Sequence, residues 1–98
     1  MSEITLRTCN AVSVTSVASS ASSVSLITAN VARKGLSIQN TSTAILYVLL
    51  GGGTATATTS HSVQIPSNGY YEVPYGFTGA VSGIWASANG SANLTEFL

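Results

Sequence analysis

Apolar and polar residues alternate along much of the chain with the period of two that is typical of β-strands. The clearest case is Lys34–Asn40, where Leu36 and Ile38 alternate with polar residues, as expected of a strand with one buried face. A polar loop at 41–44 leads to a second strand, Ile45–Leu50, in which both sets of alternating positions are apolar. We predict that these strands form a central hairpin. Because a strand that is apolar on both faces must be covered on both, we expect a terminal arm or a partner chain to cover the face that the core does not.

Shorter alternating segments predict further strands, and turn residues separate them. The last two form the clearest predicted hairpin, because Asn89-Gly90 is the preferred pair for a type I′ turn. Counting outward from that turn places Trp85 opposite Leu94, as a pair that fills the core. A helix over 17–24 is the alternative in the N-terminal third, but Ser and β-branched residues disfavour it. The further strands are expected around Val12–Val14, Val24–Leu26, Val63–Ile65, Tyr71–Val73, Ala80–Ala88 and Ser91–Phe97.

Together these segments predict an all-β protein, an antiparallel β-sandwich of about eight short strands with jelly-roll or immunoglobulin-like topology. We expect one sandwich domain over residues 12–98, preceded by an extended N-terminal arm or edge strand over residues 1–11. The only large aliphatic residues of Met1–Val17 are Ile4 and Leu6, so this segment can add little to a core. We expect the arm to order on a neighbouring subunit by strand addition. The Gly- and Thr-rich segment 51–59 predicts a flexible, solvent-facing loop.

The charge content is unusually low and limits the classes of function. Charged residues make up 6% of the 98 residues and the net charge is zero, whereas about 25% is typical of soluble domains. This composition argues against nucleic-acid binding, which needs several Lys and Arg contacts to phosphates. A surface of this kind does not repel its own copies, so self-association is favoured. Cys9 is the only cysteine, so no disulfide within the chain is expected, and no apolar run approaches the length of a membrane span.

Residues that carry chemistry are sparse and separated in the sequence. His61 is the only histidine, there is no Asp, and the three glutamates are Glu3, Glu72 and Glu96. A nucleophile–base pair would lack its orienting acid, and one His with one Cys cannot form a zinc site. We therefore expect no enzymatic activity, no metal site and no cofactor.

The aromatic residues have two interpretations. Tyr70, Tyr71, Tyr75, Phe77 and Trp85 fall within sixteen positions and could form a stacking platform for a sugar. The alternative is that they fill the core and a subunit contact, where large amphipathic aromatics are enriched. We favour the core and interface interpretation, because sugar sites usually add hydrogen-bonding acids, which we expect this chain to lack.

Four short segments resemble a module of small virion proteins of tailed bacteriophages. They are 33–40 (RKGLSIQN), 45–48 (ILYV), 69–74 (GYYEVP) and 83–86 (GIWA), and the resemblance covers roughly residues 12 to 97. In that family the module occurs as a capsid decoration or cement protein, as a head-fibre part, or as an end domain of a tail-associated protein. The resemblance implies no catalytic residues. Because this chain begins at Met1 with the module alone, it is more similar to a stand-alone decoration protein than to a piece of a long fibre.

The resulting expectation is a non-enzymatic capsid decoration or cement protein. It would be made in the cytoplasm of the host bacterium and bind the outer surface of the phage head. It would stabilise contacts between major capsid subunits, as a homotrimer. The alternative is a carbohydrate- or receptor-binding module of a head or tail fibre, with a host-surface glycan as partner. The residues expected to contact other subunits or the capsid are Ile4, Leu6, Leu46, Val48, Leu50, Tyr70, Tyr75 and Phe77.

Overall fold

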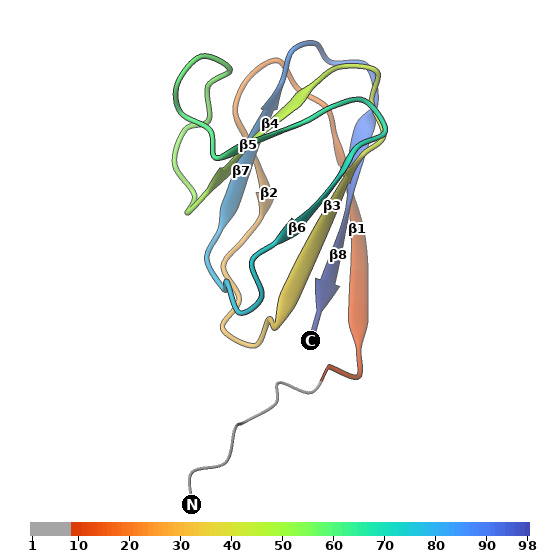
Figure 1. Ribbon diagram of the computed structural model, residues 1–98, viewed down its shortest axis with the longest axis vertical. Coiled ribbons are helices and arrows are strands. Elements are labelled where there is room, and N and C mark those ends of the chain that lie inside the picture. The colour runs from red at the N-terminus through yellow and green to blue at the C-terminus, as the bar shows by residue number, and fades with distance from the viewer. Residues whose placement is uncertain (1–8) are drawn as a thin grey trace, which may run out of the picture.

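The computed structural model describes residues 9–98, which form two antiparallel four-stranded sheets packed as a sandwich (Figure 1). This confirms the prediction of an all-β sandwich, and no helix occurs between residues 9 and 98. Candidate contacts Ile4 and Leu6 lie outside the described residues. The strands are β1 Val12–Ala18, β2 Val24–Ile27, β3 Gly35–Asn40, β4 Leu46–Leu50, β5 Val63–Ile65, β6 Tyr70–Val73, β7 Val81–Trp85 and β8 Ser91–Phe97.

The strand order is that of a jelly roll. One sheet, called sheet A, has the order β1-β8-β3-β6, and the other, sheet B, has the order β2-β7-β4-β5. The pairs β1·β8, β2·β7, β3·β6 and β4·β5 are nested, as in one long hairpin wrapped onto itself. Every connection except β4–β5 crosses between the sheets. The immunoglobulin-like alternative is therefore wrong, because that fold joins several consecutive strands within one sheet.

Both predicted hairpins are wrong for the same reason. The segment after β3 crosses from sheet A to sheet B, and the segment after β7 crosses back. Trp85 consequently pairs with Leu46, and Leu94 pairs with Ile38. Asn68 is the only described non-glycine residue with a positive φ, so Asn89 does not adopt the type I′ conformation. Crossing places Trp85 and Leu94 on facing sheets, where each is buried, and this burial outweighs a local turn preference.

The second apolar face of β4 is partly covered by the chain's own β4–β5 loop. Leu46 and Val48 point into the core and are fully buried. On the outer face, the ring of His61 lies against Tyr47 with 5.0 Å between ring centroids. Gly53 approaches Leu49 so closely that a Cβ there would lie 3.2 Å from Leu49 Cδ2. The β4–β5 loop thus supplies cover for the outer face of β4.

That loop is less open to solvent than its composition predicted. Most of its residues are exposed, but Ala55 is buried, and its N–H donates to Ser23 Oγ at 2.9 Å. The loop therefore contacts the segment before β2 through Ala55, and it contacts β4 through Gly53 and His61. The prediction of a wholly solvent-facing segment at 51–59 is wrong at Ala55.

Arg33 is a buried structural residue that links three parts of the chain. Its Nε donates to Glu96 Oε2 on β8 at 2.8 Å. Nη1 donates to the carbonyl oxygens of Gly79 (2.8 Å) and Phe77 (3.3 Å), and Nη2 donates to that of Thr28 (2.6 Å). A guanidinium group that is fully buried and has these partners cannot contact phosphates, which further lowers the basic charge available at the surface.

Asn40, at the end of β3, links the two sheets through its buried side chain. Nδ2 donates to the carbonyl oxygens of Ala44 (2.7 Å), Ile65 (2.9 Å) and Pro66 (3.2 Å). Oδ1 accepts from Trp85 Nε1 at 3.1 Å and from Ser42 Oγ at 2.9 Å. Buried polar atoms need such partners, and the sheet crossing after Asn40 is held in place by them.

Candidate binding surface

No other described strand packs on the outer face of sheet A (Figure 1), and Tyr75, which follows β6, covers Gly35 at one end of that face. Cross-strand partners share a face, and since Leu36 and Ile38 belong to the core, their neighbours Gly35, Ser37 and Gln39 point outward. The strand register then arranges the outward residues in three rows across the sheet. The rows are Val12–Phe97–Gly35, Val14–Thr95–Ser37–Glu72 and Ser16–Asn93–Gln39–Tyr70.

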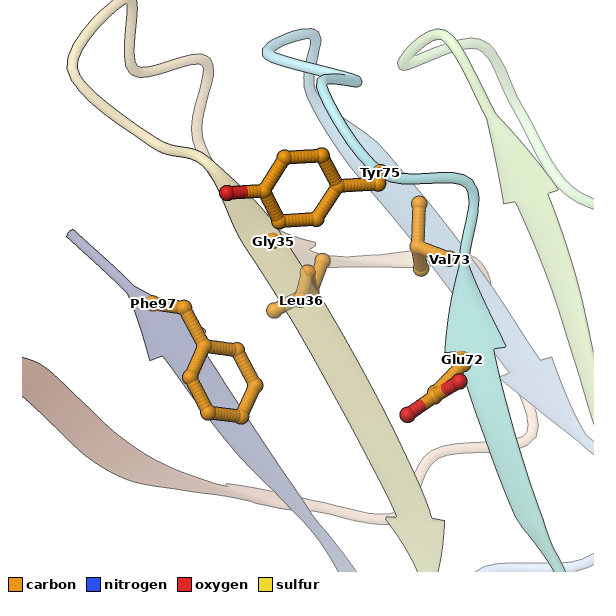
Figure 2. A pocket seen from close by; sticks show the side chains of 6 residues that line it. All are labelled: Gly35, Leu36, Glu72, Val73, Tyr75 and Phe97. Atoms are coloured by element: carbon orange, nitrogen blue, oxygen red, sulfur yellow. The ribbon is translucent and has the colours of Figure 1, made fainter. Parts of the chain in front are cut away.

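A pocket of about 310 Å³ lies on this face, where two aromatic rings flank a glycine (Figure 2). A Cβ on Gly35 would lie 3.4 Å from both Tyr75 Cδ1 and Phe97 Cδ2. Gly35 is buried beneath the two rings, and the absence of a side chain there lets the backbone of β3 form the pocket floor. Glu72 forms a third side of the rim, with its carboxylate directed from β6 toward β3 (Figure 2). Leu36 and Val73 complete the lining.

Among the described residues that line this pocket, Glu72 alone carries a charged group. The Tyr70 hydroxyl donates to Glu72 Oε2 at 3.3 Å. Within residues 9–98, the one ion pair joins Arg33 and Glu96, so no described cation neutralises Glu72 directly. A carboxylate has about four lone-pair sites, and one hydroxyl donor leaves most of them for water or a ligand.

The structure divides the predicted contact residues into buried and exposed sets. Tyr70 and Tyr75 are 60% and 59% exposed, so a partner can reach both. Leu46 and Val48 are core residues, and Leu50 and Phe77 pack against the core from partly buried positions. The prediction that Leu46 and Val48 contact other subunits is wrong, because both point into the core. The sequence shows that both faces of β4 are apolar, but it does not show which face points inward.

Two of the residues that build the pocket, Gly35 and Phe97, carry no signal in the sequence that marks them as site residues. Neither residue is among the predicted contacts, and Glu72 enters the sequence-based prediction only as one of three glutamates that are separated in the sequence. Phe97 lies opposite Gly35, and Glu72 lies opposite Ser37. Both pairings join segments distant in the sequence, so no local pattern signals them. The alternation of apolar and polar residues around Glu72 is the only local signal for this site. It predicts that Glu72 points away from the core, but it does not predict which side chains lie beside it.

The second feature of sheet A is the open edge of β1. Of the strands in residues 9–98, only β8 pairs with β1, and all residues of β1 except Val17 are exposed. Val12 and Val14 on the outer face are 58% and 64% exposed. The strand contains no proline and no charged residue, which are the devices that usually protect an edge from pairing with another chain.

The hydrogen-bond register identifies which backbone groups of β1 are free. Leu98 N–H donates to Ala11 O, and Ser19 N–H donates to Gly90 O. Because hydrogen-bonded pairs recur at every second residue of an antiparallel ladder, the odd-numbered residues of β1 point their N–H and C=O groups toward β8. The even-numbered residues, which are Val12, Val14, Ser16 and Ala18, direct theirs to the open edge.

Groups capable of catalysis or metal binding do not converge in the described part. His61 Nδ1 lies 3.0 Å from the Thr56 carbonyl oxygen, and its ring packs on Tyr47. No group of three or more His, Cys, Asp or Glu residues that could hold a metal ion occurs within residues 9–98. In the same range, no helix is long and apolar enough to cross a membrane.

Comparisons of this chain with protein-family models, with curated proteins and with solved structures found no match.

Proposed function

We propose that this protein is a non-enzymatic structural protein of a bacteriophage virion, a decoration or cement protein on the outer surface of the head. It joins neighbouring major capsid subunits and is synthesised in the cytoplasm of the host bacterium. The observation that carries the proposal is the open, uncharged edge of β1, which is exposed on both faces. The similarity of segments 33–40 and 69–74 to small phage virion proteins supports the phage context. The jelly roll adds an analogy, because this architecture recurs in viral capsid proteins, although a fold alone does not specify a function.

The physical basis of attachment is strand addition. Four residues of β1 present unpaired N–H and C=O groups, and an extended segment of another subunit can pair with them. Each hydrogen bond formed adds about 0.5–1.5 kcal/mol net. The side chains of Val12 and Val14 supply apolar area for burial beside the new strand, at about 25 cal/mol per Å². The near absence of surface charge removes a source of repulsion between copies.

A homotrimer is part of this proposal, and the open edge of β1 is the feature that supports it. The apolar outer face of β4 does not by itself require a partner, since the chain's own loop contributes cover. A ring of three copies needs a head-to-tail contact between two different surfaces. In the trimer, the β1 edge of each copy is one of these surfaces, and a different surface of the next copy is the other. The assembled trimer then binds the major capsid protein.

Co-sedimentation with purified capsids tests the proposal, with a backbone variant as the probe. Ser16→Pro removes an N–H that points to the open edge and leaves the hydrogen bonds to β8 in place. We expect this variant to fold, with an unchanged circular dichroism spectrum, and to bind capsids at least about tenfold more weakly. Ser16→Ala keeps the N–H and is the matched control, which should bind as the unmodified protein does.

Three results would count against the proposal. If the unmodified protein does not sediment with capsids, the decoration function is wrong. If Ser16→Pro decorates capsids normally, attachment does not use the β1 edge. A single 10 kDa species in sedimentation at micromolar concentration would contradict the trimer. Deleting Met1–Asn10 distinguishes the contribution of the N-terminal arm to attachment from that of the β1 edge. The deletion should leave β1 intact and the sandwich folded, while attachment to capsids weakens.

A further inference from the structure

We propose that the pocket on the outer face of sheet A is a binding site for a single neutral sugar ring. This inference goes beyond attachment to a capsid, because it concerns a second ligand of a different chemical class. It rests on the convergence of Tyr75, Phe97, Glu72 and Gly35, which come from four separate parts of the sheet and its flanking loop.

The chemistry of the rim matches the two sides of a pyranose. A sugar ring presents a patch of C–H groups, which packs favourably on the electron-rich face of an aromatic ring. Tyr75 and Phe97 offer two such rings on either side of the pocket floor (Figure 2). The hydroxyl groups of the sugar need acceptors, and an ionised carboxylate forms O–H···O⁻ bonds about twice as strong as neutral ones. Glu72 supplies that carboxylate at the same rim.

The size of the pocket favours one ring and not a longer chain. Its volume of about 310 Å³ is at the lower end of the roughly 300–1,000 Å³ range of small-molecule sites. Gly35 sets this volume, because any branched side chain there would project between Tyr75 and Phe97. The pocket therefore depends on a glycine whose role is to leave space.

The surroundings favour a polyol over a cation. A carboxylate between aromatic rings also suits an ammonium group. However, the outward residues of the adjacent row on β8 and β3 are hydroxyl side chains, namely Thr95 and the largely buried Ser37. These groups can donate hydrogen bonds to a sugar as well as accept them. A cation, which only donates, could use them only as acceptors.

The site can be tested on the isolated protein by NMR titration. The probes are the methyl pyranosides of glucose, galactose, mannose and N-acetylglucosamine, each added up to tens of millimolar. We expect at least one probe to bind with a Kd on the order of 1 mM, as small single-ring sites of modest contact area do. The largest shifts should be those of Gly35, Glu72, Tyr75 and Phe97.

Three variants and one control locate the binding. Tyr75→Ala and Glu72→Gln should each weaken binding about tenfold, and Gly35→Val should abolish it by filling the pocket. Gly35→Val adds side-chain contacts instead of removing them. It therefore still tests the site if the Tyr75→Ala variant fails to fold. Val31→Ser is the control, because Val31 is 91% exposed and does not line the pocket.

Two outcomes would overturn the inference. One is the absence of any shift in this pocket with all four probes. The other is binding of choline or lysine methyl ester in a salt-sensitive manner without binding of a sugar, which would assign the pocket to cations. Because the titration uses no capsid, its failure would leave the decoration function standing, and a failure of co-sedimentation would leave the sugar site standing.

Discussion

Replacing Asn40 by alanine tests whether one buried amide stabilises the crossing between the two sheets. In the folded protein, Asn40 Oδ1 accepts from Trp85 Nε1, and Nδ2 donates to the Ala44 and Ile65 carbonyl oxygens. The substitution leaves the buried indole N–H of Trp85 without this acceptor. The Ala44 oxygen keeps a second partner, Ser42 Oγ at 2.9 Å, so it is not orphaned.

The expected loss follows from these contacts. A buried donor without a partner costs about 1–3 kcal/mol, and the space left by the amide adds a smaller cavity term. We expect Asn40→Ala to lower the free energy of unfolding by about 2–4 kcal/mol, a large part of the roughly 5–15 kcal/mol typical of a domain. For a protein of this size, that corresponds to a fall in Tm of at least about 8 °C.

Urea denaturation measures this change, with fluorescence as the probe, because Trp85 is the only tryptophan. Gln39→Ala is the matched control, since it removes an amide of similar size from the exposed neighbouring position on β3. We expect the control to stay within about 0.5 kcal/mol of the unmodified protein.

A double-mutant cycle identifies the hydrogen bond as the cause. Trp85→Phe removes the indole N–H, so it should cost about 1–3 kcal/mol less in the Asn40→Ala background than in the unmodified protein. Circular dichroism replaces fluorescence in this cycle. A loss below about 1 kcal/mol for Asn40→Ala, or simple additivity within about 0.5 kcal/mol, would refute the reasoning.

Three further substitutions test other parts of the structure by urea and thermal denaturation, followed by circular dichroism because Trp85→Ala removes the only tryptophan. Trp85→Ala should cost about 3–5 kcal/mol because it empties the centre of the core, and normal folding of this variant would contradict the core assignment. Glu96→Ala leaves the Arg33 guanidinium buried without its carboxylate and should cost about 3–5 kcal/mol. This loss should change little between low and high salt, because buried pairs are weakly screened, so a strongly salt-dependent loss would indicate a surface pair. Gly90→Ala would place a Cβ 2.5 Å from Ser42 Cα, and this overlap with the backbone should cost about 1–3 kcal/mol. An unchanged Tm would contradict the close approach of Gly90 to Ser42.

The positions of the strands could be predicted from the sequence because their signals are local. Alternation marks β3, and prolines and glycines mark the ends of β5 and β6. β4 was recognised from its continuous apolar run. These signals depend on side-chain direction and on backbone restrictions within a few residues, so they are present in the chain before any tertiary contact forms.

The pairing of the strands could not be predicted in this way. A short polar segment such as 41–45 can turn a chain back in one sheet or carry it across to the facing sheet, and its composition is suited to both. Burial of Trp85 and Leu94 on opposite sheets selects the crossing. Arg33 shows the same limit, because its partner Glu96 is 63 residues away, and a charged residue with no visible partner is assigned to the surface.

The sequence by itself thus determined an all-β chain with few charged residues and no net charge, the approximate extent of its strands and the scarcity of groups for catalysis. Only the tertiary structure decided that the topology is a jelly roll, that the outer face of β4 is partly covered by the chain's own loop, and that Glu72, Tyr75 and Phe97 surround Gly35. The physical reason is distance along the chain. Alternation specifies which way a side chain points, whereas the neighbours it meets depend on strands that are brought together only when the whole sandwich closes.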